Sequence, residues 1–201
     1  MQASHNHEPI GVVLAGGDSR RMGRDKARLR VAESSLAERA AVRLYAVCTE
    51  VVIADRGRRV VAGERSIADG PGRGPAAALL GAAEVYPGRS LLALACDLPA
   101  VTTELLRHLA RPPGSAAELD AHVPRWQRGI EPLCALYLPS ALAALSVEVA
   151  AGRFALHRLL RSDHLRSRYL EGTALTHFGA PERLFSNLNT PQDLARWQGL
   201  A

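Results

Sequence analysis

Residues 14–27 combine glycines, basic side chains and carboxylates at a spacing suited to holding a phosphate chain. They read L-A-G-G-D-S-R-R-M-G-R-D-K-A and follow an apolar run. Gly16 and Gly17 carry no Cβ, so their backbone N–H groups can approach an anion closely. Arg21 offers a planar fork of donors and Lys26 a compact charge, and the two can neutralise a triphosphate from two sides. A surface loop with incidental arginines is the alternative interpretation.

The common phosphate-binding fingerprints do not account for this segment. It contains neither G-x-x-x-x-G-K-[ST] nor G-x-G-x-x-G. Lys26 is the one lysine among the 25 basic residues of the chain. An arginine bias this strong is typical of a GC-rich genome, so the remaining lysine is a candidate for a specific role.

A carboxylate follows the apolar run 91–96, in the sequence C-D-L-P. If Asp97 lies at the end of a strand and faces a triphosphate, it is a natural ligand for Mg²⁺. This ion takes one or two carboxylates together with phosphate oxygens and keeps several waters. The alternative is an exposed aspartate that caps a helix.

A second carboxylate, Asp69, precedes the loop G-P-G-R-G-P at 70–75. It could accept hydrogen bonds from N1–H and the 2-amino group of guanine, and it would repel the carbonyl acceptors of uracil or cytosine. A turn aspartate satisfied by its own backbone is the alternative. Asp55, after the second predicted strand, is a further candidate for a base or ribose contact.

The elements that must position these residues alternate between strands and helices in the first half of the chain. Continuous apolar runs predict buried parallel strands. They are followed by amphipathic or alanine-rich stretches with N-cap candidates at Ser34, Ser35, Thr102 and Thr103 and with Pro75 in a first helical turn. The predicted strands are 10–14, 50–54 and 91–96, with weaker extended pieces around 60–61 and 67, and the predicted helices are 36–47, 76–86 and 103–110.

The second half is less regular. Its predicted elements are strands at 121–124, 133–138 and 175–178, and helices at 140–150, 153–161 and 191–198. The alternation predicts an α/β fold: a single three-layer domain with a doubly wound, mostly parallel sheet of Rossmann-like type. The ligand site of such a sheet lies beyond the carboxyl ends of its strands. We expect residues 1–9 to form a flexible tail, and residues 10–201 to form one domain with a nucleotide-binding half (about 10–111) and an acceptor-binding half (about 112–201).

Composition limits the function classes. Apolar residues make up 47% of the 201 residues and charged residues 22%, which excludes a disordered or collagen-like chain. The net charge of +5 fits an anionic partner, but the arginines are scattered and aromatic residues are scarce, which argues against nucleic acid. Three widely spaced cysteines indicate reduced thiols, and no run approaches a membrane span. We expect a cytoplasmic protein with no membrane or nucleic-acid partner.

Residues 14–27 resemble the opening motif of the molybdenum cofactor guanylyltransferases, L-A-G-G-x-S-x-R-M-G-x-D-K-A. These enzymes have the wider nucleotide-diphospho-sugar transferase-like fold. The resemblance implies that the backbone of Leu14, Ala15, Gly16 and Gly17 contacts the nucleotide and that Arg21 and Lys26 bind its phosphates. It also implies that Asp97 binds Mg²⁺ and that Asp69 selects guanine.

The resemblance extends to the C-terminus, with two departures. The segment N-L-N-T-P-Q-D-L at 187–194 is similar to the family's N-x-N-T-P-x-[DE]-L. Alternate asparagines of an extended piece project to one face, so Asn187 and Asn189 could bind the acceptor. The alternative for this segment is a turn and a helix N-cap. The departures are G-P-A-A-A at 74–78, where relatives have G-P-L-A-G, and Asp55, where relatives often have Asn.

The reading that follows is a Mg²⁺-dependent guanylyltransferase that uses GTP and a molybdopterin-type acceptor and makes no covalent enzyme intermediate. We expect Arg21, Lys26 and Asp97 to be its catalytic residues. Another nucleotidyltransferase of the same fold, using CTP or a phospho-sugar or phospho-polyol, is the nearest alternative. A non-catalytic nucleotide- or nucleic-acid-binding protein is the other. We further expect a monomer or weak homo-oligomer with transient contacts to proteins that deliver or receive the cofactor.

Overall fold

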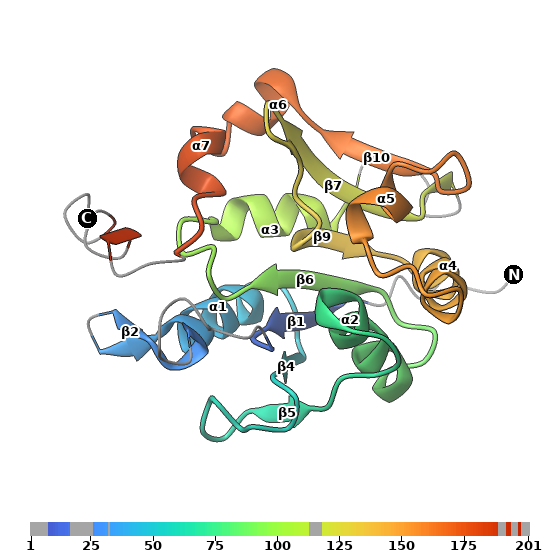
Figure 1. Cartoon of the computed structure of the whole chain (residues 1–201). Helices are drawn as coiled ribbons and strands as arrows, with labels where there is room; N and C mark the ends of the chain where they lie inside the picture. The colour runs from blue at the N-terminus through green and yellow to red at the C-terminus, as the bar shows by residue number, and fades with distance from the viewer. Residues whose placement is uncertain are drawn as a thin grey trace, which may run out of the picture.

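A computed structural model of the chain describes residues 8–16, 26–31, 33–112, 118–188, 192–193 and 197. In this part of the chain an eight-stranded sheet runs through the molecule in the order β10-β7-β9-β6-β1-β4-β5, with β8 paired to β7 (Figure 1). A two-stranded ribbon, β2–β3, lies apart from it. The strands are β1 (Ile10–Leu14), β2 (Arg30–Val31), β3 (Ser34–Ser35), β4 (Val51–Ala54), β5 (Arg65–Ile67), β6 (Leu91–Ala95), β7 (Ala121–Trp126), β8 (Gly129–Ile130), β9 (Cys134–Tyr137) and β10 (Ser167–Leu170).

The first half supplies the parallel core of the sheet. β1 pairs in parallel with both β4 and β6, and β4 pairs in parallel with β5. Every residue of β1, β4 and β6 is buried. This is the burial expected of a sheet covered on both faces, and it explains the continuous apolar runs. The predicted strands at 10–14, 50–54 and 91–96 are therefore confirmed to within a residue at either end.

The helices of the first half begin largely where the sequence predicts. They are η1 (Lys26–Arg28), α1 (Leu36–Tyr45), α2 (Gly74–Val85) and α3 (Thr103–Ala110). The Ser35 hydroxyl accepts from the Glu38 backbone and the Glu38 carboxylate accepts from the Ser35 backbone, a complete capping box. Thr102 caps α3 through its side-chain hydroxyl alone.

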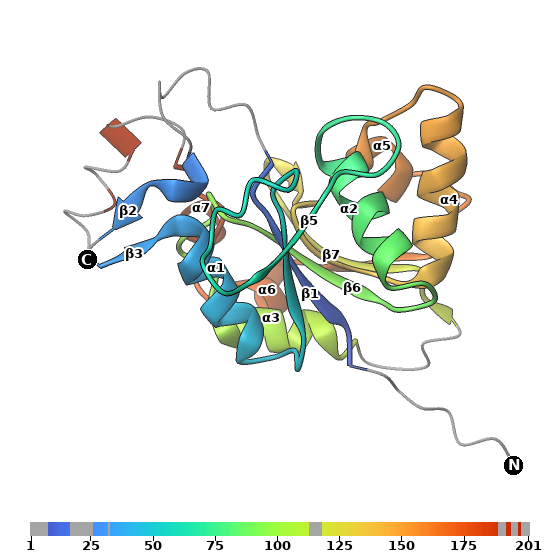
Figure 2. The same ribbon diagram turned by 90° about the horizontal axis from the view of Figure 1, so that it is seen from below.

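The layers form as predicted, with helices on both faces of the sheet. α1 and α3 pack together on one face, and α2 and α4 (Pro139–Ala150) pack together on the other (Figure 2). The remaining helices are α5 (Leu156–Leu160), α6 (Gly172–Thr176) and α7 (Pro181–Leu184). The predicted three-layer, mostly parallel α/β fold is therefore confirmed.

Two predictions in the second half are wrong in detail. The sequence around 175–178 is not a strand: α6 covers Gly172–Thr176, and the strand is β10 at Ser167–Leu170. The predicted helix 153–161 is shorter, because α5 begins at Leu156. The final predicted helix, 191–198, lies mostly outside the described residues. β10 lies at a sheet edge and reads S-R-Y-L, so it lacks the continuous apolar run that marks the inner strands.

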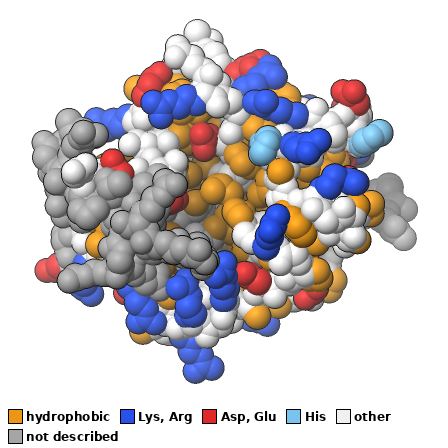
Figure 3. All heavy atoms as spheres, in the orientation of Figure 1, with side chains coloured by type: hydrophobic (Ala, Val, Ile, Leu, Met, Phe, Trp, Pro, Cys, Tyr) orange, Lys and Arg blue, Asp and Glu red, His pale blue; other side chains and the backbone are white. Residues whose placement is uncertain are grey.

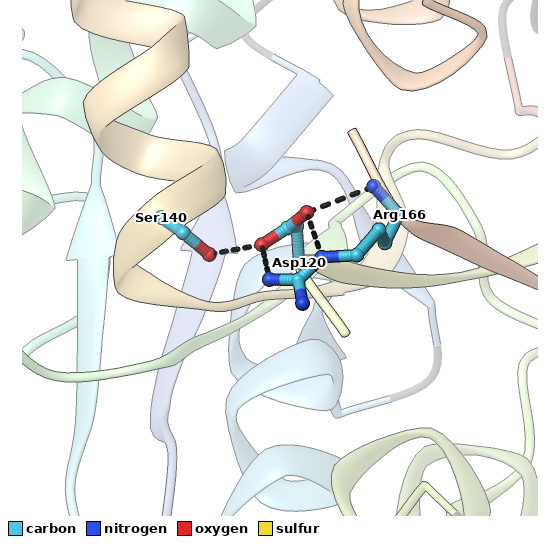
Figure 4. A network of polar contacts seen from close by, with 3 residues as sticks. All are labelled: Asp120, Ser140 and Arg166. Carbon is cyan, nitrogen blue, oxygen red and sulfur yellow. Dashed lines mark hydrogen bonds and ion pairs between the residues drawn. The ribbon is translucent and has the colours of Figure 1, made fainter. Parts of the chain in front are cut away.

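A carboxylate joins three elements of the second half. Asp120, just before β7, accepts hydrogen bonds from the backbone and guanidinium of Arg166 and from the hydroxyl of Ser140 (Figure 4). These bonds lower the pKa of Asp120, chiefly through the Arg166 side chain. They connect the start of β7 to α4 and to the residue before β10, so Asp120 fixes the edge of the sheet.

All three cysteines are buried and none forms a disulfide. Within the described ranges, every helix is too short or too polar to cross a membrane.

Candidate functional site

The carboxyl ends of the parallel strands meet at one edge of the sheet. Leu14 pairs with Ala54 and with Ala95, and Ala54 pairs with Ile67. The residues that come next are therefore neighbours across the edge: Ala15 and Gly16 after β1, Asp55 and Arg56 after β4, Asp69 after β5, and Asp97 after β6. The structure thus brings Leu14, Ala15, Gly16, Asp69 and Asp97 to the edge where the sequence predicts a ligand site.

Gly16 is not required by packing among the described residues. A Cβ placed there would lie 3.5 Å from the Ala54 carbonyl oxygen and 3.6 Å from Nε of Arg56, which are ordinary contacts. Its φ angle is not in the left-handed region either. The reason for a glycine at this position must therefore lie outside the described contacts, as it would if a ligand approaches the backbone.

Asp55 forms its hydrogen bonds within the loop that follows β4 and with β5. Its side chain is fully buried. One carboxylate oxygen accepts from the Val60 backbone N–H at 2.8 Å, and the other accepts from the Ser66 hydroxyl. Both oxygens are thus engaged within the fold. Asp55 thus closes the loop between β4 and β5. The structure offers no support for a contact between Asp55 and the base or ribose.

Asp69 is engaged on one side only. Its Oδ2 accepts from Nε of Arg56 at 3.0 Å. Its Oδ1 is shielded from solvent and has no hydrogen-bond partner among the described residues. A buried acceptor without a partner is costly, so this oxygen is poised to accept a hydrogen bond from a ligand donor.

The backbone around Asp69 is held against α2 by two glycines. A Cβ on Gly70 would lie 2.6 Å from the Gly81 nitrogen, and a Cβ on Gly81 would lie 2.2 Å from the Ala68 carbonyl oxygen. The Gly70 N–H also donates to the Ala77 carbonyl at 2.8 Å. Only a pair of glycines allows this approach, and sequence reasoning did not identify Gly81.

Asp97 meets the C-terminal segment. The Leu188 N–H donates to the Asp97 carbonyl at 3.0 Å, and Leu188 is buried while Asn187 is exposed. The segment predicted to bind the acceptor therefore runs beside the predicted metal ligand. Asn189, the second predicted acceptor residue, lies outside the described residues.

A second carboxylate near Asp97 was not assigned a role from the sequence. Glu131 is half-buried, and one of its oxygens accepts from Nε1 of Trp126 at 3.2 Å. Burial raises the pKa of Glu131, the Trp126 hydrogen bond opposes that shift, and the negative charge of Asp97 adds to it. Asp97 follows β6, and Glu131 precedes β9, the strand paired with β6.

The donor set fits a divalent ion shared with a substrate. Among the described residues no three His, Cys, Asp or Glu side chains gather into a metal-binding group. Mg²⁺ bound to a nucleotide needs only one or two carboxylates, with phosphates and water completing its shell. The half-exposed Asp97 can supply such a ligand.

Three predicted phosphate-binding groups are not placed. Gly17 and Arg21 lie outside the described residues. Lys26 begins η1, but its side chain is not among those described.

A cavity of about 720 Å³ opens at the end of β7. It lies between the β7–β8 turn, which carries Trp126, and helices α6 and α7. Because β7 and β6 both pair antiparallel to β9, their carboxyl ends lie at the same edge of the sheet. The cavity is thus at the same edge of the sheet as Asp97, on the side of the second half of the chain.

Comparison with known proteins identifies the family. Residues 11–167 match the model of the MobA-like NTP transferase domain. A probable molybdenum cofactor guanylyltransferase of Pelotomaculum thermopropionicum is 34% identical over 96% of this chain and 94% of its own length. The molybdenum cofactor guanylyltransferase of Syntrophotalea carbinolica is 30% identical over 93% and 89%, respectively.

A solved structure agrees with these relatives. Molybdopterin-guanine dinucleotide biosynthesis protein A of Archaeoglobus fulgidus matches with a TM-score of 0.79 and 27% identity, over 95% of this chain and 97% of that one. A cytidylyltransferase of Thermus thermophilus, specific for 2-C-methyl-D-erythritol 4-phosphate, shares the fold with a TM-score of 0.68 at 19% identity, over 96% and 98%. Since the family model covers most of the chain and the curated relatives nearly all of it, the chain belongs to the MobA-like NTP transferases and is a nucleotidyltransferase.

Proposed function

We propose that this chain is a molybdenum cofactor guanylyltransferase that transfers GMP from GTP to the phosphate of molybdopterin. The similarity to curated guanylyltransferases over almost the whole chain supports it most strongly. An acceptor phosphate oxygen attacks the α-phosphorus of GTP, a new P–O bond forms, and the bond to the bridging oxygen breaks. Pyrophosphate leaves with that oxygen and its electron pair.

The proposed roles follow the edge of the sheet. The backbone of Leu14, Ala15, Gly16 and Gly17 approaches the nucleotide, and Asp69 accepts from the guanine N1–H and 2-amino groups. Arg21 and Lys26 hold the phosphates. No side chain of the protein needs to act as nucleophile, because positioning and charge neutralisation supply the catalysis in such transfers.

Nucleotidyltransferases of this type generally use a divalent metal ion, and we propose that it is Mg²⁺, held by Asp97. The bound ion would neutralise charge on the triphosphate. Asn187 and Asn189 would contact the acceptor, since the segment that carries them begins beside Asp97. Molybdopterin would then lie on the side of the acceptor half, and cysteines that form no disulfide fit a reducing cytoplasm.

Nucleotide-dependent thermal stabilisation tests the proposal. The unfolding temperature is measured with Mg²⁺ and each of GTP, CTP, UTP and ATP, for the wild type and Asp69→Ala. GTP should stabilise the wild type most. At saturating ligand, a tenfold preference in affinity adds about 1.4 kcal/mol to the free energy of unfolding. The preference should disappear in Asp69→Ala.

The other outcomes are equally informative. A preference for CTP would keep the fold and the chemistry but replace the substrate. An equal response to all four nucleotides would remove Asp69 from base selection. No response to any nucleotide, with steep salt-dependent binding of an oligonucleotide instead, would favour a nucleic-acid-binding protein.

A further inference from the structure

Asp69 alone reads only part of guanine. A carboxylate pairs with the two donors of the base, N1–H and the 2-amino group, but it offers nothing to the O6 acceptor beside them. A site that reads the whole edge needs a donor next to the carboxylate, and arginine is the side chain most often used for O6 and N7 of guanine.

We propose that Arg56 supplies this donor: its guanidinium holds the Asp69 carboxylate through Nε and donates from a terminal nitrogen to O6 of the guanine. This proposal rests on the proposed function, because it concerns the base of GTP. It adds a specificity-determining residue that the sequence motifs do not identify.

The placement of Arg56 supports the role. Its Nε lies 3.0 Å from Oδ2 of Asp69, while the side chain as a whole is 39% exposed. Its stem lies beside the backbone of Gly16, where a Cβ would be 3.7 Å from Cγ of Arg56. The side chain therefore lies between the turn after β1 and the carboxylate after β5, and both of these features are proposed to contact the nucleotide.

The backbone at Arg56 also points to a constrained residue. Its φ angle is +62°, in the left-handed region that L-amino acids seldom adopt. The loop on either side is tied to the fold: the buried Asp55 carboxylate accepts from the Val60 N–H at 2.8 Å, and the Arg58 guanidinium donates to the Ala15 carbonyl at 2.6 Å. Strained residues that a fold holds in place occur often at ligand sites.

The surface around it is basic. Lys and Arg side chains gather at the lower edge of the face in Figure 3, where β5 and the loop before it lie in Figure 1. That loop carries Arg56, Arg58 and Arg59. Arg59 is exposed, has a φ angle of +50°, and makes no contact with Asp69 that parallels the one from Arg56. It therefore offers a control matched in charge and in backbone strain.

The test combines base analogues with variants. Binding of GTP, 6-thio-GTP and ITP with Mg²⁺ is measured by calorimetry for the wild type, Arg56→Ala and Arg59→Ala. In 6-thio-GTP a sulfur, a weak acceptor, replaces O6, and ITP lacks the 2-amino group that Asp69 reads. The wild type should bind GTP roughly tenfold more tightly than 6-thio-GTP, the scale of one good polar contact to a base.

In Arg56→Ala we expect GTP binding to weaken to the level of 6-thio-GTP, so that their affinity ratio falls to about one. Arg59→Ala should keep the wild-type ratio. If Arg56 only positions Asp69, its loss will instead reduce the ratio of GTP to ITP and leave that of GTP to 6-thio-GTP unchanged, which overturns the proposal. The same holds if wild-type protein binds GTP and 6-thio-GTP equally.

Two further measurements keep the outcome clear. If Arg56→Ala does not fold, Arg56→Met keeps most of the apolar stem and removes every donor, and a wild-type ratio of GTP to 6-thio-GTP in this variant overturns the proposal. The proposed function fails separately, when the wild type shows no preference for GTP over CTP and ATP. A GTP preference that does not depend on O6 therefore rejects the role of Arg56 alone.

Discussion

Two aspartate–arginine pairs, one in each half of the chain, differ in how completely the fold satisfies the hydrogen bonding of the aspartate. Asp120 is 5% exposed at its side chain, and both its oxygens accept hydrogen bonds from Ser140 and Arg166. Asp69 is 22% exposed, and one of its oxygens is bonded to Arg56 while the other is buried with no partner among the described residues. The first carboxylate is satisfied by the fold. The second keeps an oxygen to which the described part of the fold offers no donor.

The contrast extends to the strands around them. In the first half of the chain, parallel strands end together and deliver their following residues to one edge. In the second half, the described polar groups with the deepest burial, Asp120 and His122, form bonds inside the fold. Substitutions in the two halves should therefore separate activity from stability.

The largest effect is expected at Asp97. Asp97→Asn should lower Mg²⁺-dependent turnover by roughly a thousandfold, because charge stabilisation in the transition state is a leading contribution to such reactions. The melting temperature should stay close to that of the wild type. Steady-state kinetics measures the effect, with Asp163→Asn, an exposed aspartate, as the control. Wild-type turnover in Asp97→Asn would refute the metal assignment.

Asp120→Asn should lower the stability of the protein and leave its nucleotide preference intact. The variant loses charge-assisted bonds to a buried carboxylate, at a cost of about 2–3 kcal/mol in the free energy of unfolding. Urea denaturation measures this loss, and the preference for GTP over CTP should survive it. A changed nucleotide preference would show that the two halves are not independent.

His122 predicts a pH dependence of stability. It is 1% exposed, and burial lowers its pKa to about 4. An unfolded histidine titrates near pH 6.5. As the pH falls from about 6.5 to 4, the unfolded state gains a proton that the folded state does not, so stability decreases across this window, by up to about 2–3 kcal/mol.

His122→Leu should remove that part of the decrease, whereas His157→Leu, at an exposed site, should leave it unchanged. Urea denaturation at a series of pH values provides the measurement. An unaltered pH profile in His122→Leu would show that the ring is not held neutral.

The smallest effect on stability is expected at Asp69. Without nucleotide, Asp69→Asn should change the free energy of unfolding by less than about 1 kcal/mol, because a partly exposed ion pair contributes little and its second oxygen has no bond to another described residue. Calorimetric melting of the nucleotide-free protein tests this. A loss as large as that of Asp120→Asn would remove the distinction between the two pairs.

Sequence reasoning reached the inner strands because their complete burial demands continuous apolar runs, and it located Asp69 and Asp97 because each follows such a run. It missed β10, whose edge position permits arginines. It could not find the contact between Arg56 and Asp69, since they are 13 residues apart and are brought together only by the pairing of β4 with β5. The same holds for Gly81, whose lack of a side chain matters only once α2 packs against the loop.

The crossing of Gly70 and Gly81 has a consequence for how substrate choice can change in such proteins. Because the loop that carries Asp69 rests directly on a helix backbone, its path is set by this packing and not by the side chains it displays. The residue at position 69 can then be exchanged without moving the loop. A lineage, or an engineer, could alter the preferred nucleobase with few substitutions, provided that neither glycine is touched.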